Sequence, residues 1–234
     1  MRLIKNLLTA ALVFTACSAG AQTADEIVAK NIDAMGGAAK LTTLNSVKLS
    51  GSMSAQGNDI PLTITKLNAK GMRLDIDLMG TSNYQIITAD KGYMFFPIQG
   101  MTEPKELDAD MVKTAQSQLD LQGSLFNYKE KGSTVEYVGT EKVDGADAYH
   151  LKLTNKYGKL VNYFIDTKTN RVVKTSGKTK GPDGQEMDSE TTYSDWKQNG
   201  DGYWFAYSTT TMQGPITYDK IETNIKVDES IFKN

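Results

Sequence analysis

The sequence of 234 residues contains one cysteine, Cys17, and one histidine, His150. Thiolate and imidazole are the side chains that most often bind zinc, copper and haem, so this inventory leaves almost no basis for such a site. A chain of this length can bury a sizeable core without disulfides. We therefore expect no cofactor and no metal, and a fold held together by its core alone.

The sequence also lacks an apolar run of the roughly 20 residues that are needed to cross a bilayer. The longest run, Leu7–Ala16, follows a basic start and precedes an A-x-A cleavage site that ends at Ala21. This arrangement is typical of a secretory signal. We expect residues 1–21 to be a signal peptide, residues 22–234 to form a single periplasmic domain, and no transmembrane segment.

A second processing signal overlaps the first. Small residues at Thr15 and Ala16 precede Cys17, as they do where a lipidated cysteine becomes the mature N-terminus. Phe14, however, stands where such sites usually carry Leu. We expect cleavage after Ala21 and loss of the cysteine. The alternative is a protein that is lipid-anchored at Cys17.

The chain has no excess of charge of one sign. Without Arg2 and Lys5, 24 of the 26 basic side chains remain against 28 acidic ones, a net charge of −4. A weak and mixed charge gives no reason to expect a nucleic-acid partner or electrostatic docking on anionic lipid.

Catalytic motifs are missing too. The sequence has no G-x-S-x-G, no P-loop and no H-E-x-x-H. Alternation places His150 on the polar side of a strand beside Lys152, away from Leu151, which predicts a surface histidine without an acid–base role. Asp108 and Asp110 fit the start of a helix. We expect no catalytic residues and no enzyme.

Hydrophobic periodicity predicts a helix followed by antiparallel sheet. Val28, Ile32 and Met35 share one helical face, with acidic residues before them and two glycines after them. From Val47 the period is two, with breakers between the apolar runs, which predicts a sheet with one dry and one wet face. A helix is predicted from Asp108 to Leu121. The predicted fold class is mainly β (α+β), with about eleven strands and a few helices.

Aromatic residues gather towards the C-terminal end, within 193–196 and 203–207, around a predicted hairpin turn at 199–202. Tyrosine and tryptophan are amphipathic, so such residues either pack a sheet face or line the mouth of a ligand site. The sequence leaves both alternatives open.

Several stretches resemble one known family. They are "ADEIVAKNIDAMGGAAKLTTLNSVKLSGSM", "TEPKEL", "LFNYKEKGSTVEYVGTEKVDGADAYHLKLT", "ETTYSDWKQNGDGYWF" and "VDESIF". The stretches, which extend from about Ala24 to Phe232, resemble periplasmic outer-membrane lipoprotein-sorting proteins, relatives of the LolA/LolB lipoprotein carriers. The resemblance implies a single LolA-like domain: a curved, incomplete antiparallel β-barrel with helices covering its concave face. In the carriers that hollow is apolar and shelters acyl chains. Their basic gating residue has no clear counterpart here, and Arg73 is the residue considered for it.

The resemblance implies a function without bond chemistry. Each buried CH₂ group favours an apolar cavity over water by about 0.8 kcal/mol, so a protein that hides an acyl chain can carry it. We predict a non-enzymatic periplasmic protein that binds lipid acyl chains or lipoproteins during outer-membrane lipoprotein sorting, with envelope proteins as further partners. The alternative is an envelope interaction or structural module with a filled core and no lipid cargo.

One parity of the early strands and one face of the predicted helix are expected to line the cavity. These residues alternate with polar partners or fall at helical spacing. The predicted lining residues are Leu49, Leu62, Ile64, Leu74, Ile76, Ile86, Val112 and Leu119.

Overall fold

The computed structural model describes residues 23–55, 57–180 and 185–234. The predicted signal peptide, its cleavage site and Cys17 lie outside the described residues. The described chain forms thirteen strands: β1 (Ser46–Ala55), β2 (Asn58–Leu67), β3 (Gly71–Leu78), β4 (Thr81–Thr88), β5 (Gly92–Phe95), β6 (Lys105–Glu106), β7 (Thr134–Val143), β8 (Ala146–Thr154), β9 (Leu160–Asp166), β10 (Val172–Lys180), β11 (Glu186–Gln198), β12 (Trp204–Thr211) and β13 (Gly214–Thr223).

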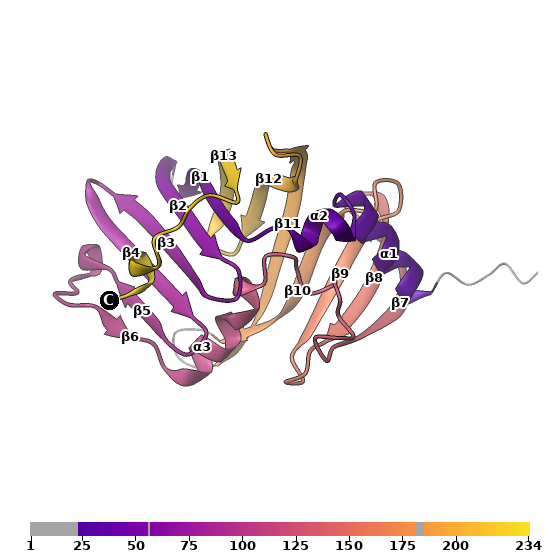
Figure 1. Ribbon diagram of the computed structural model, residues 1–234, viewed down its shortest axis with the longest axis horizontal. Helices are drawn as coiled ribbons and strands as arrows, with labels where there is room; N and C mark the ends of the chain where they lie inside the picture. The colour runs from indigo at the N-terminus through magenta and orange to yellow at the C-terminus, as the bar shows by residue number, and fades with distance from the viewer. Residues whose placement is uncertain (1–22, 56, 181–184) are drawn as a thin grey trace, which may run out of the picture.

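All thirteen strands belong to one open antiparallel sheet, in the order β6-β5-β4-β3-β2-β1-β13-β12-β11-β10-β9-β8-β7 (Figure 1). The chain runs outward from β1 to β6, crosses to β7 at the opposite edge, and returns strand by strand to β13, which pairs with β1. The predicted fold class, a mainly β protein with a curved open sheet, is confirmed. The predicted number of strands was too low.

Helices are few and short. Helix α1 (Ala24–Ala34) begins with a capping box, in which Thr23 Oγ1 accepts from the Glu26 amide and the Glu26 carboxylate accepts from the Thr23 amide. Helix α2 (Ala38–Thr42) follows directly. Helix α3 (Ala109–Ala115) is capped by Asp108 and tightens into the 3₁₀ helix η2 (Gln116–Leu119). The helix predicted over 108–121 is therefore two shorter pieces.

The inner face of the sheet is the face that carries Leu49, Ile64 and Leu74, which are paired across β1, β2 and β3. On this face, α1 packs Ile27 and Val28 against an apolar cluster that includes residues of β8 and β9. Helix α3 and η2 pack against an inner-face cluster formed by β3 and β4. The helices thus supply the second layer that a curved sheet needs to bury one face.

The outer face of β3 and β4 is covered by the C-terminal segment, which ends in the 3₁₀ helix η3 (Glu229–Phe232) and crosses these strands in Figure 1. Phe232 is buried against Gly71, where an added Cβ would lie 2.6 Å from the phenyl ring. Arg73 donates to the Ile231 carbonyl at 3.1 Å. A glycine at position 71 therefore makes room for the aromatic side chain that anchors the tail.

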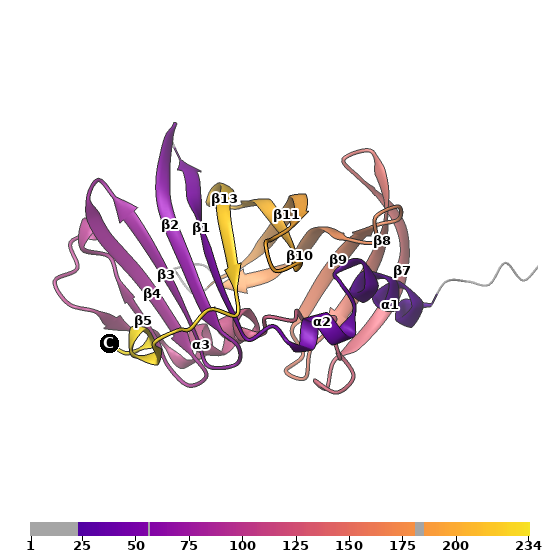
Figure 2. The same cartoon turned by 45° about the horizontal axis from the view of Figure 1, so that its top comes forward.

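The sheet splays into two wings (Figure 2). The first wing consists of β1–β6 and the second wing of β7–β9. Strands β12 and β13 pair only between Ser208–Thr211 and Gly214–Thr217. Beyond that short ladder β12 pairs only with β11, and β13 only with β1. The separation of β12 from β13 opens the inner face near the middle of the molecule.

Candidate ligand-binding cavity

A cavity of about 510 Å³ lies between the inner face and the segments that cover it. Its walls come from α1, α2, the stretch 117–126, and the central and second-wing strands. Four of its residues, Trp204, Phe205, Ala206 and Tyr218, belong to the parts of β12 and β13 that do not pair with each other. The divergence of these two strands therefore creates the space.

The aromatic residues near the C-terminal end form one wall. Tyr193, Trp196, Tyr203, Trp204 and Phe205 all line the cavity. The Trp196 indole donates to the Val172 carbonyl at 3.2 Å, so its polar atom is satisfied while its rings remain available for apolar contact. Of the two alternatives that the sequence left open, the structure supports the one in which these aromatic residues line a cavity.

Two tyrosines of the cavity wall are shielded from solvent by burial. Burial raises the pKa of Tyr163 to about 12 and also raises the pKa of Tyr218, so both phenols stay neutral. Among the described residues that line it, Lys159 is the one charged side chain. Burial lowers the pKa of the Lys159 ammonium, which is the shift expected of a base moved out of water and is opposite in direction to that of the two phenols.

Two amide side chains of the cavity wall donate hydrogen bonds within the protein. Asn31 donates to the Asn170 carbonyl at 2.8 Å, and Gln122 donates to the Leu44 carbonyl at 3.4 Å. A ligand in this cavity would therefore meet mainly apolar surface. Among the described polar residues of its lining, Lys159 alone is charged.

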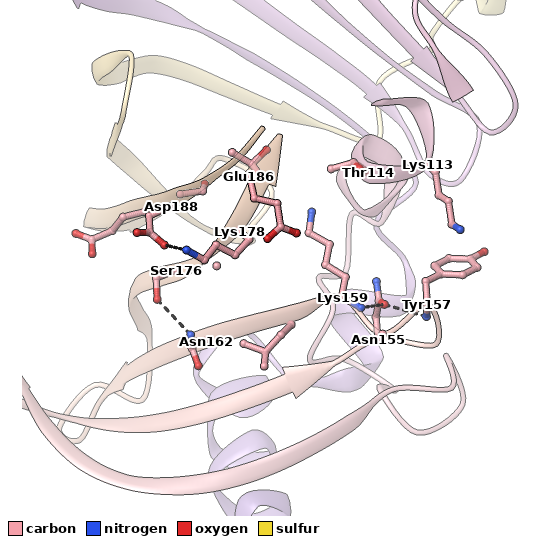
Figure 3. A pocket seen from close by; sticks show the side chains of 16 residues that line it. Lys113, Thr114, Asn155, Tyr157, Lys159, Asn162, Ser176, Lys178, Glu186 and Asp188 are labelled. Atoms are coloured by element: carbon pink, nitrogen blue, oxygen red, sulfur yellow. Dashed lines mark hydrogen bonds and ion pairs between the residues drawn. The ribbon is translucent and has the colours of Figure 1, made fainter. Parts of the chain in front are cut away.

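Two further cavities adjoin the first, because Asn155 and Lys159 line all three. A polar cavity of about 920 Å³ lies between α3, the β8–β9 turn and the ends of β10 and β11 (Figure 3). The third cavity, of about 460 Å³, lies beside α3, η2 and the same turn. The β8–β9 turn thus stands where apolar and polar space meet.

The predicted lining residues lie in four different places. Leu49 lines the cavity, and Leu62, Ile64, Leu74 and Ile76 continue from it as an inner-face apolar cluster without lining the cavity. These four residues belong to the first wing, and side chains such as Leu121 pack against them. The prediction placed the hollow in the first wing, whereas the cavity is lined mainly by residues of the central and second-wing strands.

Val112 and Leu119 cover the first wing, where they are buried against Met72 and Ile87. Ile86 lies on the other side of the sheet: it pairs with Arg73, whereas its neighbour Ile87 pairs with Met72 on the inner face. The structure thus places Ile86 on the face of the sheet opposite the cavity. Two successive isoleucines make alternation ambiguous, and the hairpin register decides between them.

Arg73 is not a gate for the cavity. Its side chain lies on the outer face, where Nε donates to Asp75 Oδ1 at 2.8 Å and the guanidinium stacks 4.3 Å from the centre of the Tyr84 ring. A basic residue that does lie on the inner face is Lys66, which pairs in register with Val47 and Met72. Burial lowers the pKa of Lys66 to about 8.

His150 lies on the outer face, as predicted, but it is not a freely exposed histidine. Its side chain is 14% exposed, Nδ1 lies 2.6 Å from Glu141 Oε1, and Nε2 lies 2.9 Å from Asn162 Oδ1. The ring stacks on Phe164 with the ring centres 4.6 Å apart. Both nitrogens thus have protein partners, and the ring lies outside the set of residues that line the cavity.

In the part of the chain that the structure describes, no group of three or more His, Cys, Asp or Glu side chains could hold a metal ion. Among the described helices, none is both long and apolar enough to span a membrane.

Comparisons with known proteins add evidence on the fold. No protein-family model matches the sequence, and no curated protein matches it. Among solved structures, a LolA superfamily protein from Nitrosomonas europaea is similar with a TM-score of 0.54 and 14% identity, over 92% of this chain and 99% of that one.

Two other solved structures are equally similar in fold. A domain named as an outer membrane lipoprotein-sorting protein, from Vibrio parahaemolyticus, has a TM-score of 0.54 and 17% identity, over 89% of this chain and 95% of that one. A DUF1329 family protein from Desulfovibrio piger has a TM-score of 0.58 and 12% identity, over 91% and 98%. The resemblance drawn from the sequence is therefore confirmed at the level of structure: this chain has the fold of the LolA superfamily proteins.

Proposed function

We propose that this protein is a non-enzymatic binder of lipid acyl chains, which it shelters in the cavity between the inner face and helices α1 and α2. The observation that carries the proposal is the cavity itself: about 510 Å³, walled by aromatic and aliphatic side chains, with one charged residue. Sites for small apolar ligands usually have roughly 300–1,000 Å³ and a few polar groups.

The physical driving force is burial of apolar surface. Each CH₂ group moved from water into such a cavity contributes about 0.8 kcal/mol. The aromatic wall adds large contact area with little loss of side-chain freedom. Holding and releasing an acyl chain requires no catalytic residues, which agrees with the expectation that the protein is not an enzyme.

The cellular setting is proposed on two grounds. The secretory signal expected at residues 1–21 directs the chain to the periplasm. One of the structural relatives is named for outer membrane lipoprotein sorting, and another for the LolA superfamily. A role in carrying lipoproteins or lipids through the envelope, as a released protein rather than one anchored at Cys17, is the function we assign.

The test is to fill the cavity without changing the rest of the fold. Ala206 lines the cavity, so Ala206→Trp places an indole in the space that an acyl chain would occupy. We expect uptake of a fluorescent fatty acid to fall by about tenfold or more, the equivalent of about 1.4 kcal/mol. Ala29→Trp, at an exposed position of α1, is the matched control and should bind as the wild type does.

Thermal unfolding of both variants shows whether they remain folded. If Ala206→Trp folds and still takes up the fatty acid normally, the cavity is not the binding site. If the wild-type protein takes up no lipid at all, the envelope interaction module without lipid cargo replaces the present proposal.

A further inference from the structure

The β8–β9 turn holds Lys159 in a fixed place at the junction of the three cavities. Asn155 Oδ1 accepts from the amides of Tyr157 and Lys159, each at 2.9 Å, and the Asn155 amide donates to the Lys159 carbonyl at 2.9 Å. These three bonds define the backbone of the turn. Lys159 is therefore presented at the cavity mouth by a rigid turn rather than by a loose loop.

The ammonium of Lys159 forms no ion pair among the described residues, although Glu186 of β11 reaches towards it in Figure 3. The Lys159 side chain is half-buried and lines the apolar cavity. Removing a lysine from water without a partner costs free energy, which an anion at the same place would offset. The apolar cavity thus carries one unsatisfied positive charge at its opening.

Two more lysines flank the same turn. The ammonium groups of Lys113 and Lys156 lie 5.1 Å and 5.0 Å from the centre of the Tyr157 ring, and neither forms an ion pair within the described chain. The Tyr157 side chain is 54% exposed, so the ring holds both cations at the surface beside the opening. Three lysines from α3 and the β8–β9 turn therefore gather at one place.

The charge of the third cavity is positive. Lys113, Lys156 and Lys159 line it together with Lys131, against a single carboxylate, Asp120. The Lys131 ammonium lies 2.7 Å from Asp120, so this pair neutralises itself. What remains in the lining of this cavity is Lys113, Lys156 and Lys159, which form no ion pair among the described residues.

The opposite wall, formed by β10 and β11, is acidic but mostly paired. Lys178 lies 2.6 Å from Asp188, and Lys174 lies 3.3 Å from Glu190. Glu186 reaches from this wall towards Lys159 in Figure 3. An incoming anion would thus be repelled by the β11 side and attracted to the α3 side, which fixes where a headgroup can sit.

We propose that the ligand is an anionic amphiphile, whose acyl chain lies in the apolar cavity and whose carboxylate or phosphate headgroup is bound by Lys113, Lys156 and Lys159. The inference rests on the proposed function, because it names the ligand class of the same cavity. Charge-assisted hydrogen bonds from ammonium groups to such a headgroup are roughly twice as strong as neutral ones. The lysines therefore select the headgroup, and the cavity selects the chain.

The experiment compares three probes of similar chain and different headgroup: palmitate, lysophosphatidate and the neutral hexadecanol. Each displaces a fluorescent fatty acid from the full mature protein. We expect the anionic probes to bind at least about tenfold more tightly than hexadecanol. Lys159→Met, and the double variant Lys113→Met with Lys156→Met, should each lower the ratio of anionic-probe affinity to hexadecanol affinity. Lys30→Met, exposed on α1, is the control.

The outcomes separate the two proposals. Tighter binding of palmitate identifies a carboxylate headgroup and tighter binding of lysophosphatidate a phosphate headgroup, and either supports the inference. Equal binding of all three probes, unchanged in the lysine variants, overturns the inference but leaves the acyl-chain cavity intact. Failure of every probe to bind overturns the proposed function and the inference with it.

Discussion

Asn199 forms hydrogen bonds between the β11–β12 turn and β13, at the place where β12 and β13 separate. It is buried, and its Nδ2 donates to the Ile221 carbonyl at 3.2 Å and to Thr223 Oγ1 at 3.0 Å. Its Oδ1 accepts from the amides of Asp201 and Tyr203 at 3.2 Å and 2.9 Å. One side chain thus joins the β11–β12 turn to β13, where the two strands share no backbone ladder.

Replacing Asn199 should be costly. Asn199→Ala leaves buried donors and acceptors without partners, each worth about 1–3 kcal/mol. We expect a loss of about 2–4 kcal/mol in the free energy of unfolding, measured by urea denaturation. Asn199→Asp keeps the two accepted bonds and loses the two donated ones, so it separates the two halves of the network. A loss below about 0.5 kcal/mol for Asn199→Ala would show that the network does not hold the strands.

Lys66 makes stability depend on pH in a defined window. Burial lowers its pKa in the folded protein from 10.5 to about 8. Below pH 8 the folded protein carries a charged, desolvated ammonium, and this cost is fully present. Between about pH 8 and 10.5 the unfolded chain binds more protons than the folded one, so this residue's contribution to stability rises with pH.

Lys66→Met should therefore stabilise the protein at neutral pH, by up to about 3 kcal/mol, since one pKa unit corresponds to about 1.4 kcal/mol. The advantage of the variant over wild type should shrink as the pH rises from about 8 to 10.5. Urea denaturation at several pH values measures the difference, with Lys30→Met as the exposed control. A variant that is less stable than wild type at pH 7 would contradict the assignment.

At the scale of residues, the sequence predicts on which face of the sheet a side chain lies only where its neighbours along the strand differ from it in polarity. The face of Leu74 was correct because Arg73 and Asp75 flank it. The face of Ile86 was not, because Ile87 is equally apolar and only pairing with β3 distinguishes them. The bonds donated by Asn199 depend on Ile221 and Thr223 of β13, which lie 22 and 24 residues further along the chain, and no local pattern marks them.

At the scale of elements, the C-terminal segment is held by the fit of Phe232 over Gly71. An added Cβ at position 71 would lie 2.6 Å from the ring, closer than atoms can pack. The tail is therefore a docked element whose position depends on one missing side chain.

This fit can be tested with a double-mutant cycle. Gly71→Ala alone should displace the tail and lower the free energy of unfolding by about 1–3 kcal/mol through overpacking. Phe232→Ala alone should cost about 3–5 kcal/mol, as for a buried aromatic. Combined, the two changes should cost less than their sum, because the clash is absent once the ring is gone. Strict additivity in urea denaturation would show that residues 71 and 232 do not interact.

The sequence predicted the start of a helix where a capping residue and the apolar periodicity agree. The acidic start of α1 and the Asp108 cap of α3 were both visible in the sequence. The helix predicted over 108–121 is shorter in the structure because its C-terminal part bonds to the turn between β2 and β3. The Leu119 carbonyl accepts from the Ala69 amide, and the Leu121 amide donates to Asn68 Oδ1. Such contacts between distant segments are not encoded in local periodicity.

At the scale of the whole molecule, the sheet and its helix layer followed from alternation and from the family resemblance, whereas the place of the cavity did not. The cavity depends on the pairing of β1 with β13 and on the short ladder between β12 and β13. Likewise, a net charge of only −2 over the full sequence hides a local group of three lysines from two segments that are about 40 residues apart. Both features arise only when the chain is folded.

The central claim is that the cavity holds an acyl chain. Native mass spectrometry of the protein purified gently from the periplasm of a bacterial host, followed by organic extraction, tests it most directly. We predict the mass of a complex between a chain that begins at Gln22 and a lipid. Extraction should then release a species with an acyl chain. A protein of bare mass that also takes up no added lipid would contradict the account.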